Sequence, residues 1–230
     1  WEYDEGRANH AIEFIERFTK HSKGAMAGKP FLLELWQKAL IAATFGIVHK
    51  VDRTRKYQEV ILIVARKNGK STLAAAIGLY LLLADGELGP EVYAVATKKD
   101  QAKIIWLEAK RMAQKSPILA KRTRRLVAEI VSDFNDGFFK PLGRDSDTLD
   151  GLNVHGALFD EVHAWKDMNL YDVVVDGTSA RENPLIFIVS TAGTVRESVY
   201  DRLYDECELV INGYDDPDGY KNERLLPIIY

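Results

Sequence analysis

The sequence predicts an α/β fold in which a mainly parallel sheet is flanked by helices. Short apolar runs rich in β-branched residues alternate with longer helical patterns, as in residues 60–64 and the apolar stretch 73–84 that follows. Polar motifs come directly after several of these runs. Because the carboxyl ends of parallel strands meet at one edge of a sheet, the motifs are expected to form one site there.

The other elements follow from periodicity and from turn residues. Ahead of the 60–64 strand, we expect helices at residues 8–19 and from about 34 to 46, separated by a loop at 21–30. A helix that begins near Lys70 is expected to end before 87–90. After it, the sequence predicts strands at 92–96, 154–159, 185–189 and 225–230, helices at 98–115, 170–180 and 197–211, and a hairpin of 126–131 with 137–141. Pro117 is expected to stop the 98–115 helix.

Composition bounds the possible classes of protein. With 230 residues, 47% of them hydrophobic, the chain can form one large α/β domain or two small ones with a real core. Its formal net charge of −3 gives no global attraction to nucleic acid or membrane. The apolar stretch 73–84 is too short to span a bilayer, so we expect no membrane partner. Cys207 has no second cysteine to pair with, which fits a reducing cytosol.

Residues 65–72 have the form of a phosphate-binding loop between a strand and a helix. Its glycine, Gly69, lets the backbone approach a phosphate, and the N–H groups of the turn and of the helix N-terminus point at the anion. Lys70 is expected to pair with the β- and γ-phosphates, and the Ser71 hydroxyl to bind Mg²⁺. The first glycine of the usual pattern is replaced by Val64.

An acid pair, Asp160 and Glu161, ends the 154–159 strand. We expect Asp160 to hold Mg²⁺ directly or through water, and Glu161 to polarise the attacking water as general base. The structural alternative is a pair of acids that merely ends a strand in solvent. The order and separation of this pair and the phosphate loop favour a RecA-like (ASCE) P-loop ATPase that uses ATP and Mg²⁺.

Two shorter segments extend the predicted nucleotide site. Ser190, Thr191 and Ala192 end the next strand, where small hydroxyl groups can hydrogen-bond the γ-phosphate side and sense its loss. Gln37 can read the adenine edge while an aromatic residue such as Trp36 packs nearby. An ordinary turn remains the alternative for the first segment, and core packing for Trp36.

A basic stretch between residues 98 and 125 contains few acidic residues. It has two open interpretations, namely contact with a nucleic-acid backbone and an ordinary solvated helix surface. Its members are Lys98, Lys99, Lys103, Lys110, Arg111, Lys115, Lys121, Arg122, Arg124 and Arg125. The histidines, including His163 just after the acid pair, lack the spacing of a zinc site.

Together these motifs resemble the N-terminal ATPase domain of the large terminase subunit of tailed bacteriophages, and the resemblance covers nearly the whole chain. The matching segments are 65–71, which lacks the first glycine and carries Arg66 after the strand, 35–37 for the adenine side, 95–102 after the second strand, 158–161 for the acid box, and 190–192 for the coupling motif. The resemblance implies an ATP-driven translocase that works as a homo-oligomeric ring on double-stranded DNA.

The resemblance also implies site residues and partners. Nucleotide contacts are expected from Trp36, Gln37, Arg66, Lys67, Asn68, Gly69, Lys70, Ser71 and Thr72. An arginine from a neighbouring subunit is expected to complete the site, with Arg144 as the nearest candidate and Arg122, Arg124 and Arg125 behind it. The implied partners are a portal protein and a small terminase subunit. The implied location is the cytoplasm of the infected bacterial host, transiently docked on the viral prohead.

The expected organisation is a P-loop ATPase core at 51–230, with residues 1–50 as an N-terminal helical segment of the same domain. Because the chain begins at Trp1, we expect a fragment, and we expect the family's C-terminal nuclease domain and its activity to be absent from it. A DExH-type helicase is the alternative enzyme, since 160–163 and 190–192 fit its motifs. A non-catalytic, nucleotide-stabilised assembly domain is the third hypothesis.

Overall fold

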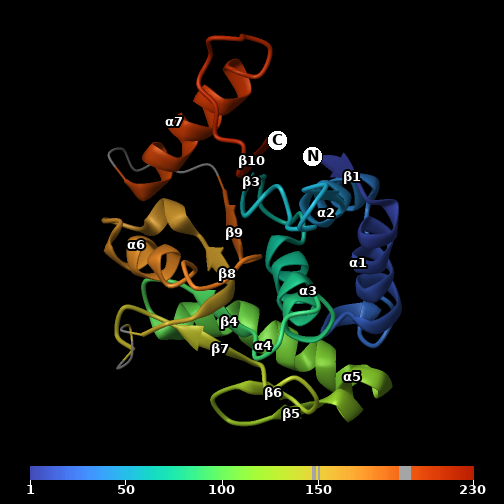
Figure 1. The fold of residues 1–230 in the computed structure, drawn as a ribbon. Coiled ribbons are helices and arrows are strands. Elements are labelled where there is room, and N and C mark those ends of the chain that lie inside the picture. Colours follow the sequence, from blue (N-terminus) through green and yellow to red (C-terminus); the bar gives the residue numbers. More distant parts are fainter. Residues whose placement is uncertain (147–148, 150, 192–197) are drawn as a thin grey trace.

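A twisted eight-stranded sheet forms the centre of the described part of the chain (Figure 1). The computed structural model describes residues 1–146, 149, 151–191 and 198–230. The strands lie in the order β10 (Leu225–Ile229), β3 (Glu59–Ile63), β9 (Leu185–Ser190), β8 (Val154–Asp160), β4 (Glu91–Val95), β7 (Phe138–Leu142), β6 (Ile130–Ser132) and β5 (Thr123–Arg125). Pairing is parallel from β10 to β7 and antiparallel at β6 and β5. The prediction of a mainly parallel sheet is confirmed.

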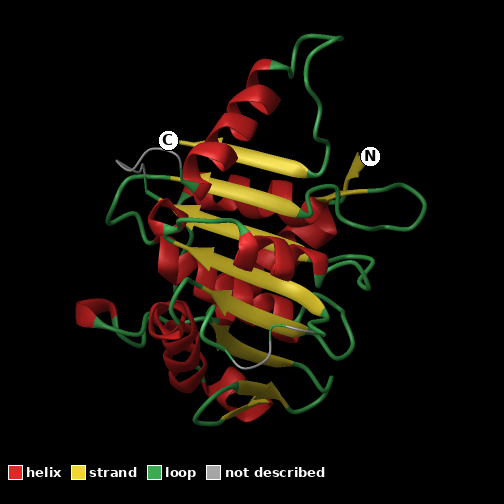
Figure 2. Cartoon of the chain, turned by 90° about the vertical axis from the view of Figure 1, so that its left-hand side faces the viewer, coloured by secondary structure: helices red, strands yellow, loops and turns green. Residues whose placement is uncertain are grey.

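Helices cover both faces of this sheet (Figure 2). On one face lie α1 (Glu5–Phe18), α2 (Leu35–Gly46), α3 (Lys70–Leu83) and α4 (Lys99–Lys115), and on the other α6 (Asn169–Asp176) and α7 (Val199–Asn212). Successive β3 residues alternate between the two cores: Val60 and Leu62 pack with α1–α4, whereas Ile61 and Ile63 pack with α6 and α7. Burial on both faces explains why this strand is apolar throughout.

Helix α3 lies directly behind the phosphate loop and is buried on nearly every side. It packs against the sheet and against α1 and α4. Gly78 allows this close approach, because a Cβ atom there would lie 2.6 Å from Leu158 Cδ1 and 2.7 Å from Phe139 Cε1. The glycine that interrupts the apolar run in the sequence is therefore a packing requirement of the sheet. No helix in the described ranges is both long and apolar enough to cross a membrane.

The main differences from the expected elements lie in short segments. Pro117 does end α4, but it also starts a further helix, α5 (Pro117–Arg122), at its first position, with Ser116 as N-cap. The predicted hairpin is β6–β7, shorter than expected at its start, and the unpredicted β5 extends it. Helix α6 ends at Asp176, four residues early. The expected helix start at 197 lies outside the described residues. Other unpredicted elements are β1 (Glu2–Tyr3), β2 (Ile47–Val48), η1 (Gly24–Met26) and η2 (Val162–Ala164).

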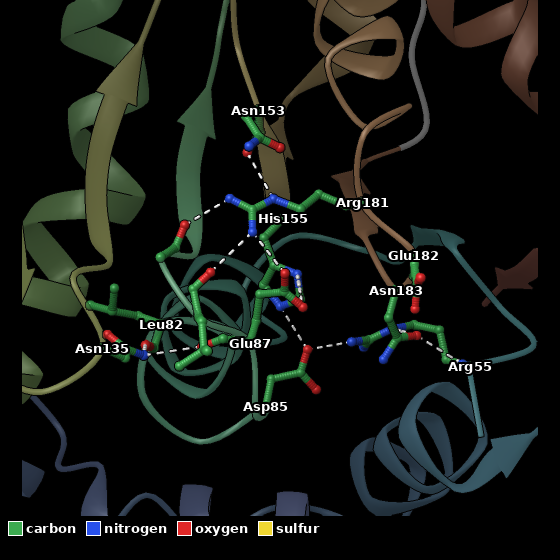
Figure 3. Close-up of polar contacts among 12 residues, drawn as sticks. Arg55, Leu82, Asp85, Glu87, Asn135, Asn153, His155, Arg181, Glu182 and Asn183 are labelled. Atoms are coloured by element: carbon green, nitrogen blue, oxygen red, sulfur yellow. Dashed lines mark hydrogen bonds and ion pairs between the residues drawn. The ribbon is translucent and has the colours of Figure 1, made fainter. Parts of the chain in front are cut away.

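A buried polar network stabilises the sheet edge where the parallel strands begin (Figure 3). Arg55, before β3, pairs with Asp85, after α3, and both are almost fully buried. Asp85 Oδ2 also lies 2.8 Å from His155 Nε2 on β8. Arg181, before β9, pairs with Glu87 at 2.7 Å. The network thus joins the start of β3, the end of α3 and the starts of β8 and β9. The opposite ends of these elements carry the predicted motifs.

Candidate active site

The carboxyl ends of β3, β8 and β9 bring the predicted motifs into one place. Strand register places Ser190 beside Ile63, where the phosphate loop begins, and Asp160 beside Val189. The loop and Glu161, the second member of the acid pair, share a cleft of about 490 Å³. The residues that line it are Arg66, Lys67, Gly69, Lys70, Ser71, Thr72, Gln101, Glu161, His163 and Ala164.

The phosphate loop has the backbone shape of an anion cradle. Lys67 and Gly69 both have left-handed φ angles, +69° and +71°, and Gly69 is the N-cap of α3. Asn68 closes the turn, since its Nδ2 donates to Ala65 O at 3.0 Å. The conformation points successive N–H groups and the α3 N-terminus toward the same space, which favours a bound phosphate. Val64, in place of the usual first glycine, is buried as the end of the apolar strand.

Asp160 combines deep burial with an unused oxygen. Asp160 is 6% exposed, and its Oδ1 has no hydrogen-bond partner among the residues that the structure describes. Burial raises the pKa of Asp160 to about 6, Glu161 adds to the rise, and the positive charge of Lys70 opposes it. A carboxylate oxygen without a donor, close to the helix start that carries the Ser71 hydroxyl, fits the oxygen ligands that Mg²⁺ prefers. Asp160 and Ser71 are therefore the residues that would hold this cation.

Glu161 is the half-exposed member of the acid pair, with 45% of its side chain accessible. Its φ of +52° is left-handed, an uncommon conformation for a residue with a side chain. Its N–H donates to Val189 O at 3.1 Å, so β9 fixes this turn. The turn directs the carboxylate into the cleft that also contains the phosphate loop. Glu161 can therefore reach a water molecule beside a bound phosphate.

His163 contacts this carboxylate, a role that the sequence did not predict. Nδ1 of His163 lies 2.8 Å from Glu161 Oε2 and 3.2 Å from Ser190 Oγ. Thr191 Oγ1 donates to the same Glu161 oxygen at 3.3 Å. Glu161 is thus connected to Ser190 through the His163 imidazole and to Thr191 directly. Ala192, the third residue of the expected coupling segment, lies outside the described residues.

A second hollow, of about 630 Å³, adjoins the phosphate loop and contains Trp36 and Gln37. Gln37 is buried, and its Oε1 accepts the Glu34 N–H at 2.9 Å in the capping box of α2. Its Nε2 lies 3.9 Å from where a Cβ on Gly69 would be, so the amide donor is beside the loop. Trp36 lines the hollow and also packs on Tyr230, with ring centroids 5.7 Å apart.

The two candidate arginines lie in different surroundings. Arg66 is exposed and lines the cleft. Arg144 is not among the cleft-lining residues of its own chain; its guanidinium donates to Asp167 and its backbone N–H to Thr97 O. Nearly half of the Arg144 side chain is exposed. From this position outside its own cleft, Arg144 can extend toward the cleft of a neighbouring copy.

Comparison with known proteins identifies the family. Residues 35–208 match the family described as "Terminase large subunit, ATPase domain". The chain is 29% identical over 191 residues to the "Terminase, large subunit" of Enterobacteria phage HK97, across 80% of this chain and 36% of that protein. It is 23% identical over 239 residues to the terminase large subunit of Lactococcus phage p2, across 100% of this chain and 42% of that protein.

The fold is also similar to that of a solved terminase. The crystal structure of the HK97 bacteriophage large terminase superposes with a TM-score of 0.80 at 24% identity, over 97% of this chain and 44% of that one. The chain thus spans less than half the length of the relatives it matches. Since the family match covers most of the sequence and includes the phosphate loop, the acid pair and Ser190, the chain belongs to the family of terminase large subunit ATPase domains.

Proposed function

We propose that the chain is the ATP-hydrolysing motor domain of a viral DNA-packaging terminase, which translocates double-stranded DNA into the prohead. The supporting observation is the single cleft in which the phosphate loop, Lys70 and Glu161 lie together in a chain of this family. The family match favours this function over the DExH helicase alternative. A further solved relative, the large terminase of a thermophilic bacteriophage, is in complex with ATP-gamma-S and shares the fold at a TM-score of 0.52.

In the proposed binding step, the N–H groups of residues 66–72 and the Lys70 ammonium hold the phosphates of ATP. Ser71 and Asp160 would hold Mg²⁺, which supplies neutralisation of the charge on the β- and γ-phosphate oxygens. The Gln37 amide donor, which lies beside the loop, reads the edge of the base. Trp36 forms part of the wall of the same hollow.

In the proposed chemical step, Glu161 accepts a proton from the attacking water, whose oxygen bonds to the γ-phosphorus. The bond to the β–γ bridging oxygen breaks, and ADP and inorganic phosphate leave. Arg66 from the same chain and an arginine from a neighbour, with Arg144 as the candidate, stabilise the charge that develops on the phosphoryl group. The segment Ser190–Thr191–Ala192 passes the change to the surface that grips DNA.

The proposed partners are double-stranded DNA, a portal protein and a small terminase subunit, with the ATPase assembled as a homo-oligomeric ring. Its place is the cytoplasm of the infected host, docked on the prohead. We also propose that residues 1–50 and 51–230 form one domain. The shared core of α1, α2 and α3 supports this organisation, because these helices bury their apolar residues together.

The experiment compares ATP turnover by wild type, Lys70→Ala and the surface control Lys50→Ala, with and without double-stranded DNA. We expect DNA to stimulate wild-type turnover, and the loss of the buried Lys70 ammonium to lower it roughly 100-fold. The control should behave as wild type, since Lys50 is exposed. ATP-dependent strand separation would favour the helicase, and absence of turnover in concentrated protein with DNA would favour the assembly domain.

A further inference from the structure

The two ends of the sheet carry opposite charges. Helix α5 with β5 forms one end, and α7 with β10 the other, at the bottom and the top of Figure 1. Residues 110–125 contain seven Lys or Arg and no Asp or Glu, whereas residues 205–223 contain seven Asp or Glu and one Lys. We name these segments the basic end and the acidic end. At about 4.8 Å per strand, β5 and β10 lie roughly 34 Å apart. That is several times the Debye length of ~8 Å, so each end presents its own field.

Three exposed carboxylates of the acidic end have no ion-pair partner within the described part of the chain. Asp205, Asp215 and Asp218 are exposed, and none forms an ion pair with a Lys or Arg of the described residues. Lys221 donates instead to backbone carbonyl oxygens of its own loop, including Tyr214 O at 3.2 Å. The negative charge of this end is therefore available to a partner.

Most of the positive side chains of the basic end likewise have no carboxylate partner within the described residues. Lys115 and Lys121 are exposed and make no ion pair within the described ranges, and Arg124 pairs only with Asp133, at 2.8 Å on the surface. Lys110 donates to a backbone carbonyl, Leu126 O, rather than to a carboxylate. The field of this end is therefore strongly positive.

The two ends also differ in shape. The acidic end has a cleft of about 490 Å³ between α7 and β10. Apolar and aromatic side chains such as Ile211, Tyr214 and Tyr220 line it, together with the charged side chains of Lys56, Asp215, Lys221 and Glu223. Tyr214 is 81% exposed, which leaves an aromatic ring in water. At the basic end, the turn between β5 and β6 exposes 94% of Val127, with Leu126 beside it. The apolar part of this cleft and the apolar tip of the turn suit each other, since contact would bury both.

We propose that the basic end of one copy docks on the acidic end of a second copy, with the 126–129 turn seated in the cleft between α7 and β10. Such a contact is heterologous, because it joins two different surfaces, and its repetition gives a ring where the rotation between copies closes and an open filament where it does not. Double-stranded DNA is the alternative occupant of the basic end. It would not account for the cleft at the acidic end, whereas a second copy would contact both ends, which complement each other in charge and shape. The contact does not require ATP hydrolysis, so it stands independently of the proposed chemistry.

The test is a charge-swap experiment on two double variants, Lys115→Glu/Lys121→Glu at the basic end and Asp205→Lys/Asp215→Lys at the acidic end. All four side chains are exposed. Association is measured by sedimentation velocity without nucleotide at low ionic strength. We expect wild type to self-associate, with added salt weakening the complex, and each variant alone to lose at least about tenfold in association constant. An equimolar mixture of the two variants should restore the complex, because reversed ends attract each other.

A matched control, Lys29→Glu/Lys50→Glu, changes the net charge by as much as the basic-end variant, at exposed sites outside the two named segments, and should associate as wild type. Val127→Glu should weaken association without harm to folding, since its side chain lies in solvent in the free chain. Monomeric wild type, variants that associate normally, or a mixture that fails to re-associate would overturn the proposal. If the basic-end variant instead lost only its affinity for a double-stranded DNA fragment, the basic end would be a DNA surface and the proposal would be wrong.

Discussion

Replacement of Asp160 by asparagine should stabilise the metal-free protein at neutral pH while it destroys the response to Mg²⁺ and ATP. Asp160 is 6% exposed, and none of the described residues donates a hydrogen bond to its Oδ1. An ionised carboxylate in this position is unfavourable until a cation balances it, because burial removes its water. The free protein therefore carries an unfavourable charge at this site above the pKa of Asp160, which a bound cation would balance.

The magnitude follows from the pKa of Asp160, which burial raises from 3.8 to about 6. Because the folded-state pKa lies above that of the unfolded chain, the folded protein holds this proton longer. Wild type therefore loses stability as pH rises through the window from 3.8 to about 6, and the loss is complete above it. At 1.36 kcal/mol per pKa unit the full loss is about 3 kcal/mol, of which roughly 2 kcal/mol falls between about pH 4.5 and about pH 7.

The assay is urea unfolding of wild type and Asp160→Asn in chelator at both pH values. Asparagine does not titrate, so the free-energy difference between variant and wild type should change in the variant's favour by roughly 2 kcal/mol from the lower to the higher pH. Costs of the new amide cancel, since they are the same at both values. Asp136→Asn, an exposed carboxylate, should leave the difference unchanged. The same free-energy difference between variant and wild type at both pH values would refute the reasoning. So would an equal stabilisation of variant and wild type by added Mg²⁺ and ATP.

Three further predictions concern single contacts. His163→Ala should lower kcat about tenfold with little change in KM for ATP, because the Glu161 carboxylate, the proposed general base, loses its 2.8 Å partner, and His163→Asn should recover part of the rate. Gln37→Glu keeps the acceptor that caps α2 but removes the amide donor beside the loop, so binding assays should show weaker preference for ATP over GTP. Asp85→Ala should cost about 3–5 kcal/mol in urea unfolding, because Arg55 is left buried and unpaired. Asp133→Ala, which breaks an exposed pair, should cost less than about 1 kcal/mol; equal costs would contradict the role of the network.

The predictable parts of the fold were those set by local patterns. Three short-range signals predicted this region correctly: the apolar 60–64 segment, the turn into Lys70 and the apolar stretch interrupted by Gly78. The structure has β3 at the first and α3 from Lys70 onward. The parallel sheet followed from the order of such segments. Short pieces such as β5 were missed because three residues hold no periodicity, and their pairing with β6 depends on the whole sheet edge.

The contacts missed at the site are those between residues distant in sequence. His163 and Ser190 are 27 positions apart, and Asp85 and His155 are 70 apart. Neither pair forms a sequence motif. The two residues of each pair come together only once the strands and helices between them are in place. The left-handed turn at Glu161 gave no signal either, since glutamate rarely adopts it. His163 could have been suspected only from its place two residues after the acid pair.

Glu161→Gln provides the most direct test of the central claim, that Glu161 activates water for ATP hydrolysis in this cleft. Glutamine has nearly the same shape but cannot accept the proton, so binding and chemistry separate. We predict that fluorescent ATP binds the variant within about twofold of wild type, while single-turnover hydrolysis falls by roughly 100-fold or more. Hydrolysis at the wild-type rate in the variant would contradict the account, because the water would then be activated by another group.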